Sequence, residues 1–238
     1  MEFTLLWAAL LAVILLRAML FVQERRDLMP DDETGWFDVL LGAAIVGLVV
    51  GRLAAMILTG TNPITHPADM ILIRGGVDTG FASVGALLYL AIALRRAGWR
   101  AADAIAPAAL AGLAGWHGGC LFRGTCLGTR SDLPWALSEP GSDLTRHPTE
   151  LYAALLFLGA ALVALTLMRR SLPISTVFSL GLASAGLIRL VTEPIRPSLG
   201  SGPIWWYAGA VLLGLILLGA AFLRPYRDGQ RQSEPNRQ

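Results

Sequence analysis

The chain of 238 residues is a series of long apolar runs separated by short polar segments. A bilayer core of about 30 Å is crossed by about 20 apolar residues in helical conformation. Seven segments meet this requirement, so the sequence predicts an all-α, polytopic membrane protein with seven transmembrane helices. The segments are residues 3–22, 37–58, 75–94, 104–122, 151–168, 173–192 and 204–223.

The composition supports this assignment. Hydrophobic residues make up 55% of the chain and charged residues only 15%, whereas about a quarter of the residues in a soluble domain are charged. The first apolar run follows Met1-Glu2-Phe3, which lacks the positive charge that opens a secretory signal peptide. We therefore expect this run to be retained as a helix.

The arginines predict the orientation, since all 19 basic residues are arginine. Cytoplasmic segments of membrane proteins are enriched in basic residues. With the N-terminus outside and the C-terminus in the cytoplasm, eleven arginines lie on the cytoplasmic side and five on the outer side. The eleven are Arg25, Arg26, Arg95, Arg96, Arg100, Arg169, Arg170, Arg224, Arg227, Arg231 and Arg237; the five are Arg74, Arg123, Arg130, Arg146 and Arg196.

The segments between the apolar runs predict the domain organisation. Residues 1–224 are expected to form a single transmembrane domain, and the polar residues 225–238 a disordered cytoplasmic tail. The outer-face loop 123–147 is long for a compact bundle, and such loops are often functional. The sequence has no internal repeat, which disfavours a repeat-built transporter.

Three charged residues near the outer end of the sixth run form the strongest candidate site. Arg189, Glu193 and Arg196 are spaced by four and three residues, which places them on one helical face. Pro194 is expected to distort the helix there. Each charge within a bilayer costs about 2.5 to 3.5 kcal/mol. The cluster either binds an anionic headgroup or is a satisfied ion-pair network, and the sequence alone leaves both open.

Other charged residues within the runs have simpler explanations. Arg52 lies toward the outer end of the second run and Arg17 toward the cytoplasmic end of the first, where each side chain can extend to the interface. Asp103 precedes the fourth run and is expected to cap the N-terminus of that helix. His147 is as well placed to brace the outer loop as to titrate, and Pro148 suits a first helical turn.

His117, Cys120 and Cys126 supply only three potential zinc ligands, which disfavours a metal site. A disulfide between the two cysteines, or two inert thiols, is the favoured alternative. No Walker motif, nucleophile elbow or nucleic-acid signature is present.

Several blocks, in order along the chain, resemble the prolipoprotein diacylglyceryl transferase family. The most specific blocks are Arg146-His-Pro-Thr-Glu-Leu-Tyr152 and Arg189-x-x-x-Glu193-x-x-Arg196. The others are Gly51-Arg52-Leu53, Asn62-Pro63 followed by Gly75-Gly76, Asp103 with Ala106-Pro107, and Gly124 and Gly128 leading to Asp132-Leu-Pro-Trp135.

The resemblance implies an enzyme of the bacterial inner membrane that needs no cofactor. It would transfer the diacylglyceryl group of phosphatidylglycerol to the lipobox cysteine of a prolipoprotein signal peptide. On this reading we expect catalytic roles for His117, Arg189 and Glu193; phospholipid-binding roles for Arg52, Arg123, Gly128, Arg130 and Arg196; and structural roles for Asp103, Asp132, His147 and Tyr152.

The chain departs from the family pattern at several positions. Gly80 stands where the family has a histidine, and Thr129 stands for an arginine. In the block after the fourth run, His117, Gly119, Cys120 and Thr125 correspond to the family's arginine, glycine, asparagine and glutamate. We expect His117 to supply the base lost at Gly80, and Arg123 or Arg130 to replace the missing arginine. The alternatives are a non-catalytic homologue that binds anionic phospholipid and, less favoured, a small transporter or channel.

Overall fold

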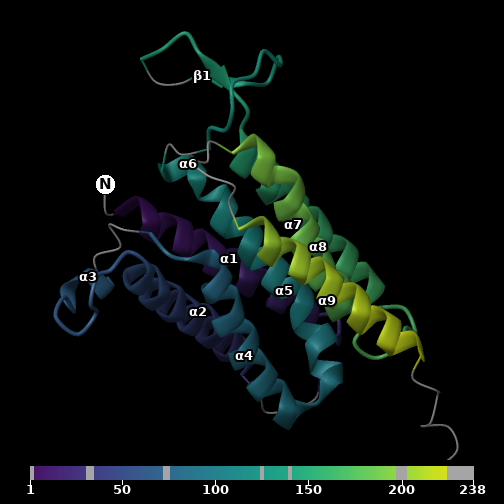
Figure 1. The fold of residues 1–238 in the computed structure, drawn as a ribbon. Coiled ribbons are helices and arrows are strands. Elements are labelled where there is room, and N and C mark those ends of the chain that lie inside the picture. Colours follow the sequence, from purple (N-terminus) through teal and green to yellow (C-terminus); the bar gives the residue numbers. More distant parts are fainter. Residues whose placement is uncertain are drawn as a thin grey trace, which may run out of the picture.

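The computed structural model describes residues 3–30, 35–71, 76–123, 126–138, 141–196 and 203–223. Within them the helices lie side by side in a bundle, and a small β-hairpin projects beyond one end (Figure 1). The elements are α1 (Phe3–Glu24), α2 (Trp36–Leu58), α3 (Ala68–Ile71), α4 (Thr79–Ala97), α5 (Trp99–Gly118), α6 (Cys120–Arg123), β1 (Leu137–Ser138), β2 (Thr145–Arg146), α7 (Thr149–Leu167), α8 (Thr176–Thr192), the 3₁₀ turn η1 (Glu193–Ile195) and α9 (Ile204–Leu223).

Six helical stretches of the described chain are long and apolar enough to cross a membrane, so the protein is a mostly helical, multi-pass membrane protein. They are Leu6–Glu24, Trp36–Leu58, Trp99–Phe122, Thr149–Leu167, Thr176–Ile195 and Ile204–Leu223. The third predicted segment is the exception. Its helix, α4, begins only at Thr79, where the Asp78 side chain accepts a hydrogen bond from the Phe81 amide. The apolar part, Thr79–Arg95, is shorter than the other spans.

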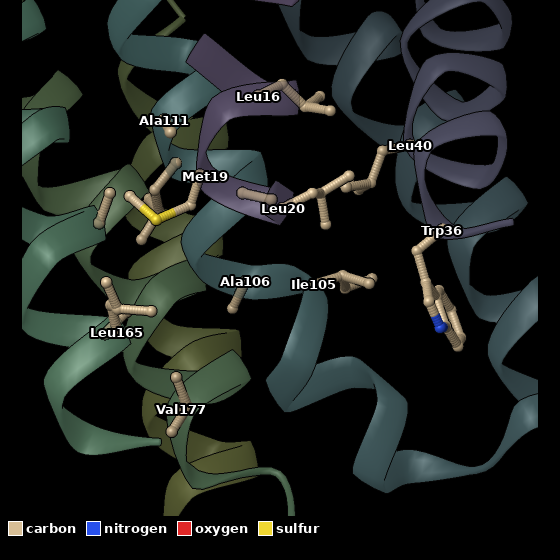
Figure 2. Close-up of a cluster of buried hydrophobic side chains, with 14 of the residues drawn as sticks. Leu16, Met19, Leu20, Trp36, Leu40, Ile105, Ala106, Ala111, Leu165 and Val177 are labelled. Carbon is tan, nitrogen blue, oxygen red and sulfur yellow. The ribbon is translucent and has the colours of Figure 1, made fainter. Parts of the chain in front are cut away.

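The α5 helix lies at the centre of the bundle, with α1, α7 and α8 packed around it. Its buried face consists largely of alanine, which lets neighbouring helices approach closely. Figure 2 shows the apolar cluster around it, in which Leu20 of α1 and Leu40 of α2 point toward each other and to which Ile105 of α5 also belongs. By contrast, only 11% of the α9 span is buried, so α9 presents most of its surface to the surrounding lipid.

Glycines allow the closest helix contacts. A Cβ atom at Gly115 of α5 would come within 2.6 Å of the backbone of Ala12 in α1, and one at Gly214 of α9 within 2.7 Å of the Ser179 carbonyl in α8. Because interiors of membrane proteins are held by packing and not by exclusion of water, such small residues decide which helices pair.

Asp103 does not cap the helix that follows it, so this prediction is wrong. The α5 helix begins four residues earlier, at Trp99, and Asp103 lies inside it. Its carboxylate instead accepts hydrogen bonds from the backbone amides of Ser175 (2.7 Å) and Phe178 (2.8 Å). Asp103 therefore caps α8 from a neighbouring helix, where the free amides of the first turn need acceptors.

Replacing Asp103 with alanine should lower the free energy of unfolding by about 1 to 3 kcal/mol, because two amides at the start of α8 lose their acceptor. Thermal unfolding of the purified protein, followed by tryptophan fluorescence, measures the change. Asp143→Ala removes an exposed carboxylate from the hairpin turn and should leave the midpoint unchanged. Equal effects of the two substitutions would show that Asp103 does not act as a cap.

The described part of the segment between α5 and α7 contains the short helix α6 and an antiparallel hairpin of two-residue strands. Leu137 pairs with Arg146 and Ser138 with Thr145, and Arg130 forms an isolated bridge with Arg146. The predicted tail at 225–238 lies outside the described residues.

Candidate functional site

The charged cluster lies where α8 ends. Thr192 is the last α-helical residue, and Glu193–Ile195 form a 3₁₀ turn at Pro194, as the proline predicts. The guanidinium of Arg189 donates from Nη2 to Glu193 Oε2 at 2.8 Å, and Arg196 Nη1 lies 3.3 Å from the same oxygen. The predicted convergence of these three side chains is confirmed.

A second carboxylate extends the cluster. Glu150, in the first turn of α7, binds Arg196 Nε through Oε1 at 2.9 Å. Burial alone would lower the pKa of Arg196, but the carboxylates of Glu150 and Glu193 outweigh that effect and raise it. The Arg196 guanidinium is therefore always protonated, and it links the two carboxylates.

His117 joins the cluster through the other oxygen of Glu150. Its Nδ1 lies 2.5 Å from Glu150 Oε2, and its ring stacks on Phe157 of α7 with 5.2 Å between centroids. His117 belongs to the last turn of α5, while Glu150 and Phe157 are one helix face of α7. The contact between α5 and α7 thus fixes the imidazole.

Arg189 has one more partner and one unused donor. Its Nη2 donates to the Tyr207 hydroxyl at 3.3 Å, and the guanidinium carbon lies 5.3 Å from the centre of that ring. Arg189 is only 8% exposed, yet its buried Nη1 has no hydrogen-bond partner among the described residues. A buried donor without an acceptor is costly, and an anionic ligand would satisfy it.

The chain before α7 packs tightly against η1. The Gly128 amide donates to the His147 carbonyl at 2.6 Å, and the Thr129 amide donates to the Ile195 carbonyl at 2.8 Å. Thr149 Oγ1 also donates to the Ile195 carbonyl. A side chain at Gly128 would collide with Thr149 Oγ1 and the Ile195 carbonyl, so this loop can approach only through glycine.

Cys120 and Cys126 are joined by a disulfide, one of the alternatives that the sequence left open. The disulfide links α6 to the segment that begins at Cys126 and leads into the site. The Glu150 amide donates a hydrogen bond to the Cys126 carbonyl at 3.5 Å. Among the described residues no three His, Cys, Asp or Glu side chains gather as metal ligands.

Two predicted phospholipid ligands lie apart from the cluster. Arg52 donates to the Asp69 carbonyl from Nε (3.0 Å) and Nη2 (2.7 Å) and to the Gly76 carbonyl from Nη1 (2.7 Å), so it holds the segment between α2 and α4. Arg130 is exposed on the hairpin. The Arg123 side chain lies outside the described part of the chain.

Two of the residues predicted to be structural, His147 and Tyr152, brace the loop that precedes α7. His147 binds Thr129 and Gly128 through its backbone, and its ring lies edge-on to Tyr152. The Tyr152 hydroxyl accepts a hydrogen bond from Trp135 Nε1 at 2.8 Å. Asp132 is exposed in the turn before Trp135.

The sequence did not identify Glu150 or Tyr207 as site residues. A carboxylate in a first helical turn is favoured by the helix dipole and by itself suggests no chemistry. Tyr207 follows Trp205 and Trp206 at the start of the last apolar run, a pattern that is typical of an aromatic belt at the membrane interface. Its position three residues into the helix that follows the charged block is the only sequence signal that it faces Arg189.

Gly80, which the resemblance aligns with a histidine of the family, is covered by another residue. The indole of Trp206 lies against it, so any Cβ atom would overlap Nε1, Cε2 and Cδ1 of that ring. The Phe81 ring also packs on Trp206, with 5.8 Å between centroids. This contact joins the start of α4 to the start of α9 and leaves no room for a base at position 80.

Replacing Gly80 with alanine should therefore destabilise the protein by about 1 to 3 kcal/mol, the usual cost of overpacking. A second substitution, Trp206→Ala, should relieve most of this cost, so the double variant should be more stable than the sum of the two single changes predicts. Thermal unfolding of the four proteins gives the coupling. Additive effects would mean that Trp206 does not occupy the space above Gly80.

The described cluster runs from His117 through Glu150, Arg196 and Glu193 to Arg189. Its two guanidiniums offer donors to an anion, and its imidazole offers a nitrogen that can accept a proton. These are the requirements of a reaction that expels a phosphate while deprotonating a nucleophile.

Comparison with known proteins agrees with the motifs. The family model of the prolipoprotein diacylglyceryl transferases matches residues 3–224. A Methylococcus capsulatus protein named phosphatidylglycerol–prolipoprotein diacylglyceryl transferase is 32% identical over 207 residues, covering 79% of this chain and 78% of its own. Proteins with the same name from Azoarcus sp. and Geobacter sulfurreducens are 30% and 29% identical, covering 78% of this chain each and 79% and 74% of their own. The chain belongs to the prolipoprotein diacylglyceryl transferase family.

Proposed function

We propose that this protein transfers the diacylglyceryl group of phosphatidylglycerol to the lipobox cysteine thiol of a prolipoprotein signal peptide. Relatives that share about 30% of its residues over most of their length are named for this reaction. The apolar spans place the charged cluster in a protein that lies within lipid, where both substrates are anchored.

The observation that carries the proposal is the buried, partly unsatisfied guanidinium of Arg189. Its Nη2 is fixed by Glu193 and Tyr207, and its Nη1 lacks an acceptor among the described residues. Such a fixed donor costs no reorganisation when a phosphate develops charge in the transition state.

In the proposed step the cysteine sulfur attacks the glyceryl carbon that carries the phosphate. The sulfur lone pair forms the C–S bond, and the C–O electron pair leaves with glycerol phosphate. The thiol proton goes to His117, because the thiolate is the reactive form. Arg189 and Arg196 bind the departing phosphate, and Glu193 orients both guanidiniums.

The other assignments are part of the same proposal. Arg52, Arg123, Gly128 and Arg130 are assigned to the path of the phospholipid headgroup. Asp103, Asp132, His147 and Tyr152 are assigned structural roles, supported by the contacts of Asp103, His147 and Tyr152.

We further propose that the cluster faces the outside of the bacterial cytoplasmic membrane. The disulfide at this end of the bundle favours an oxidising compartment, because thiols stay reduced in the cytosol. In this topology α4 is a seventh, short span, the N-terminus is outside, and residues 225–238 are a disordered cytoplasmic tail after a single transmembrane domain. A green fluorescent protein fused to the C-terminus should fluoresce; a dark fusion made at normal levels would contradict the topology.

The function is tested with the purified protein, phosphatidylglycerol and a lipobox peptide. We expect the peptide to gain the mass of one diacylglyceryl group, and a strain depleted of its own transferase to be rescued by this chain. The competing candidate, a lipid-binding homologue without activity, is favoured by the loss of the histidine at Gly80. Binding of phosphatidylglycerol without product or rescue would establish that candidate.

A further inference from the structure

We infer that Glu150 is a positioning residue that fixes the tautomer of His117, so that Nε2 of this imidazole is free to accept the thiol proton. The inference rests on the proposed function for its chemical meaning. Its structural content, which nitrogen of His117 carries the proton, can be tested without any reaction.

Both oxygens of Glu150 are occupied by donors. Oε1 accepts from Arg196 Nε at 2.9 Å, and Oε2 lies 2.5 Å from His117 Nδ1. The Glu150 side chain is only 11% exposed, so water has little access to either oxygen. An ionised carboxylate can only accept hydrogen bonds, and therefore His117 Nδ1 must carry the proton.

The lone pair of the neutral ring is then on Nε2. This nitrogen has no hydrogen-bond partner among the described residues, whereas Nδ1 is held by Glu150. Stacking on Phe157, with ring planes only 10° apart, fixes the direction in which Nε2 points. A histidine whose second nitrogen is held by a carboxylate is the arrangement of a general base and its orienting acid.

In the transfer step Nε2 takes the proton from the thiol as the sulfur forms the C–S bond. The resulting imidazolium lies against the carboxylate of Glu150, which stabilises the positive charge. The phosphate leaves with the electrons of the broken C–O bond, and the imidazolium then returns its proton to water. No other reactant is needed.

Replacing Glu150 with glutamine distinguishes control of the His117 tautomer from a purely structural contact. The amide has one acceptor and one donor, but the two neighbours would both require an acceptor. Arginine cannot become an acceptor, whereas histidine can, by moving its proton from Nδ1 to Nε2. In Glu150→Gln the amide oxygen should therefore turn to Arg196 and its NH₂ group to His117, so that Nε2 becomes protonated and loses its function as a base.

The decisive measurement is ¹⁵N nuclear magnetic resonance of histidine-labelled full-length protein at a pH where the ring is neutral. The chain has only three histidines, and the signals of His117 are assigned by their absence in His117→Asn. We expect the proton on Nδ1 in the wild type and on Nε2 in Glu150→Gln. Replacing Arg196 with alanine in the glutamine variant should return the proton to Nδ1, because the amide oxygen is then free to face His117.

Kinetics provide the second readout. Glu150→Gln should lower kcat about 10²- to 10⁴-fold with little change in KM, comparable to the loss of a general base or its correct tautomer. Glu150→Asp keeps both acceptors and should retain the Nδ1 proton. An unchanged tautomer in Glu150→Gln, or wild-type kcat in that variant, would overturn the inference. If the wild type itself forms no thioether, the proposed function fails, and the tautomer measurement still decides the role of Glu150.

Discussion

Replacing Arg189 with alanine should reduce thioether formation at least about 10²- to 10³-fold, the cost of removing one fixed donor from a developing negative charge. The fold should survive. Glu193 remains paired with Arg196, whose Nη1 lies 3.3 Å from its Oε2, so no carboxylate is left buried and alone. The rate is measured by mass spectrometry of the lipobox peptide with saturating phosphatidylglycerol.

Arg17→Ala is the matched control for this experiment. Arg17 also lies within a predicted span, but its partner is Glu24 at 3.0 Å, and both side chains are 48% exposed. Exposed pairs of this kind contribute little, and we expect a wild-type rate. Full activity of Arg189→Ala would show that the guanidinium has no part in the transfer.

Replacing Glu193 with alanine should have the largest effect on stability. It removes the shared acceptor of Arg189 and Arg196, and it leaves the Arg189 guanidinium, which is 8% exposed, without a counter-ion. Breaking a buried ion pair in this way costs about 3 to 5 kcal/mol. The melting midpoint of Glu193→Ala should therefore be lower than that of Arg189→Ala.

The difference between the melting midpoints of Glu193→Ala and Arg189→Ala is the informative quantity. Both variants should lose activity whether the cluster binds phosphate or only holds the structure together, so activity alone does not separate these two roles. Removing Arg189 and Glu193 together should restore part of the stability lost in Glu193→Ala, as no uncompensated charge then remains beside Tyr207. If Glu193→Ala melts at the wild-type temperature, the cluster is more hydrated than its burial indicates.

Local sequence features predicted much of the bundle. Run length and hydropathy identified the spans, and the last predicted range, 204–223, coincides with α9. The spacing of Arg189, Glu193 and Arg196 predicted their ion pairs, because residues three and four apart meet on one helix face. The prediction was less accurate for α4. The apolar run was predicted to start at residue 75, but the helix begins only after Asp78, the residue that caps it.

Contacts between distant segments could not be predicted in the same way. His117 meets Glu150 across 33 residues, and Asp103 meets Ser175 across 72. Nothing in the composition near Asp103 distinguishes a cap for its own helix from a cap for a neighbour. Only the packing of α5 between α7 and α8 brings these groups together, and that packing depends on the whole bundle.

The central claim is that Arg189 binds the phosphate of phosphatidylglycerol. An experimental structure of the protein in a nanodisc with this lipid, in the absence of peptide, tests it most directly. We predict a phosphate oxygen within hydrogen-bond distance of Arg189 Nη1, the buried donor that has no partner among the described residues. A headgroup located elsewhere, with Arg189 Nη1 bonded only to protein atoms, would contradict the account.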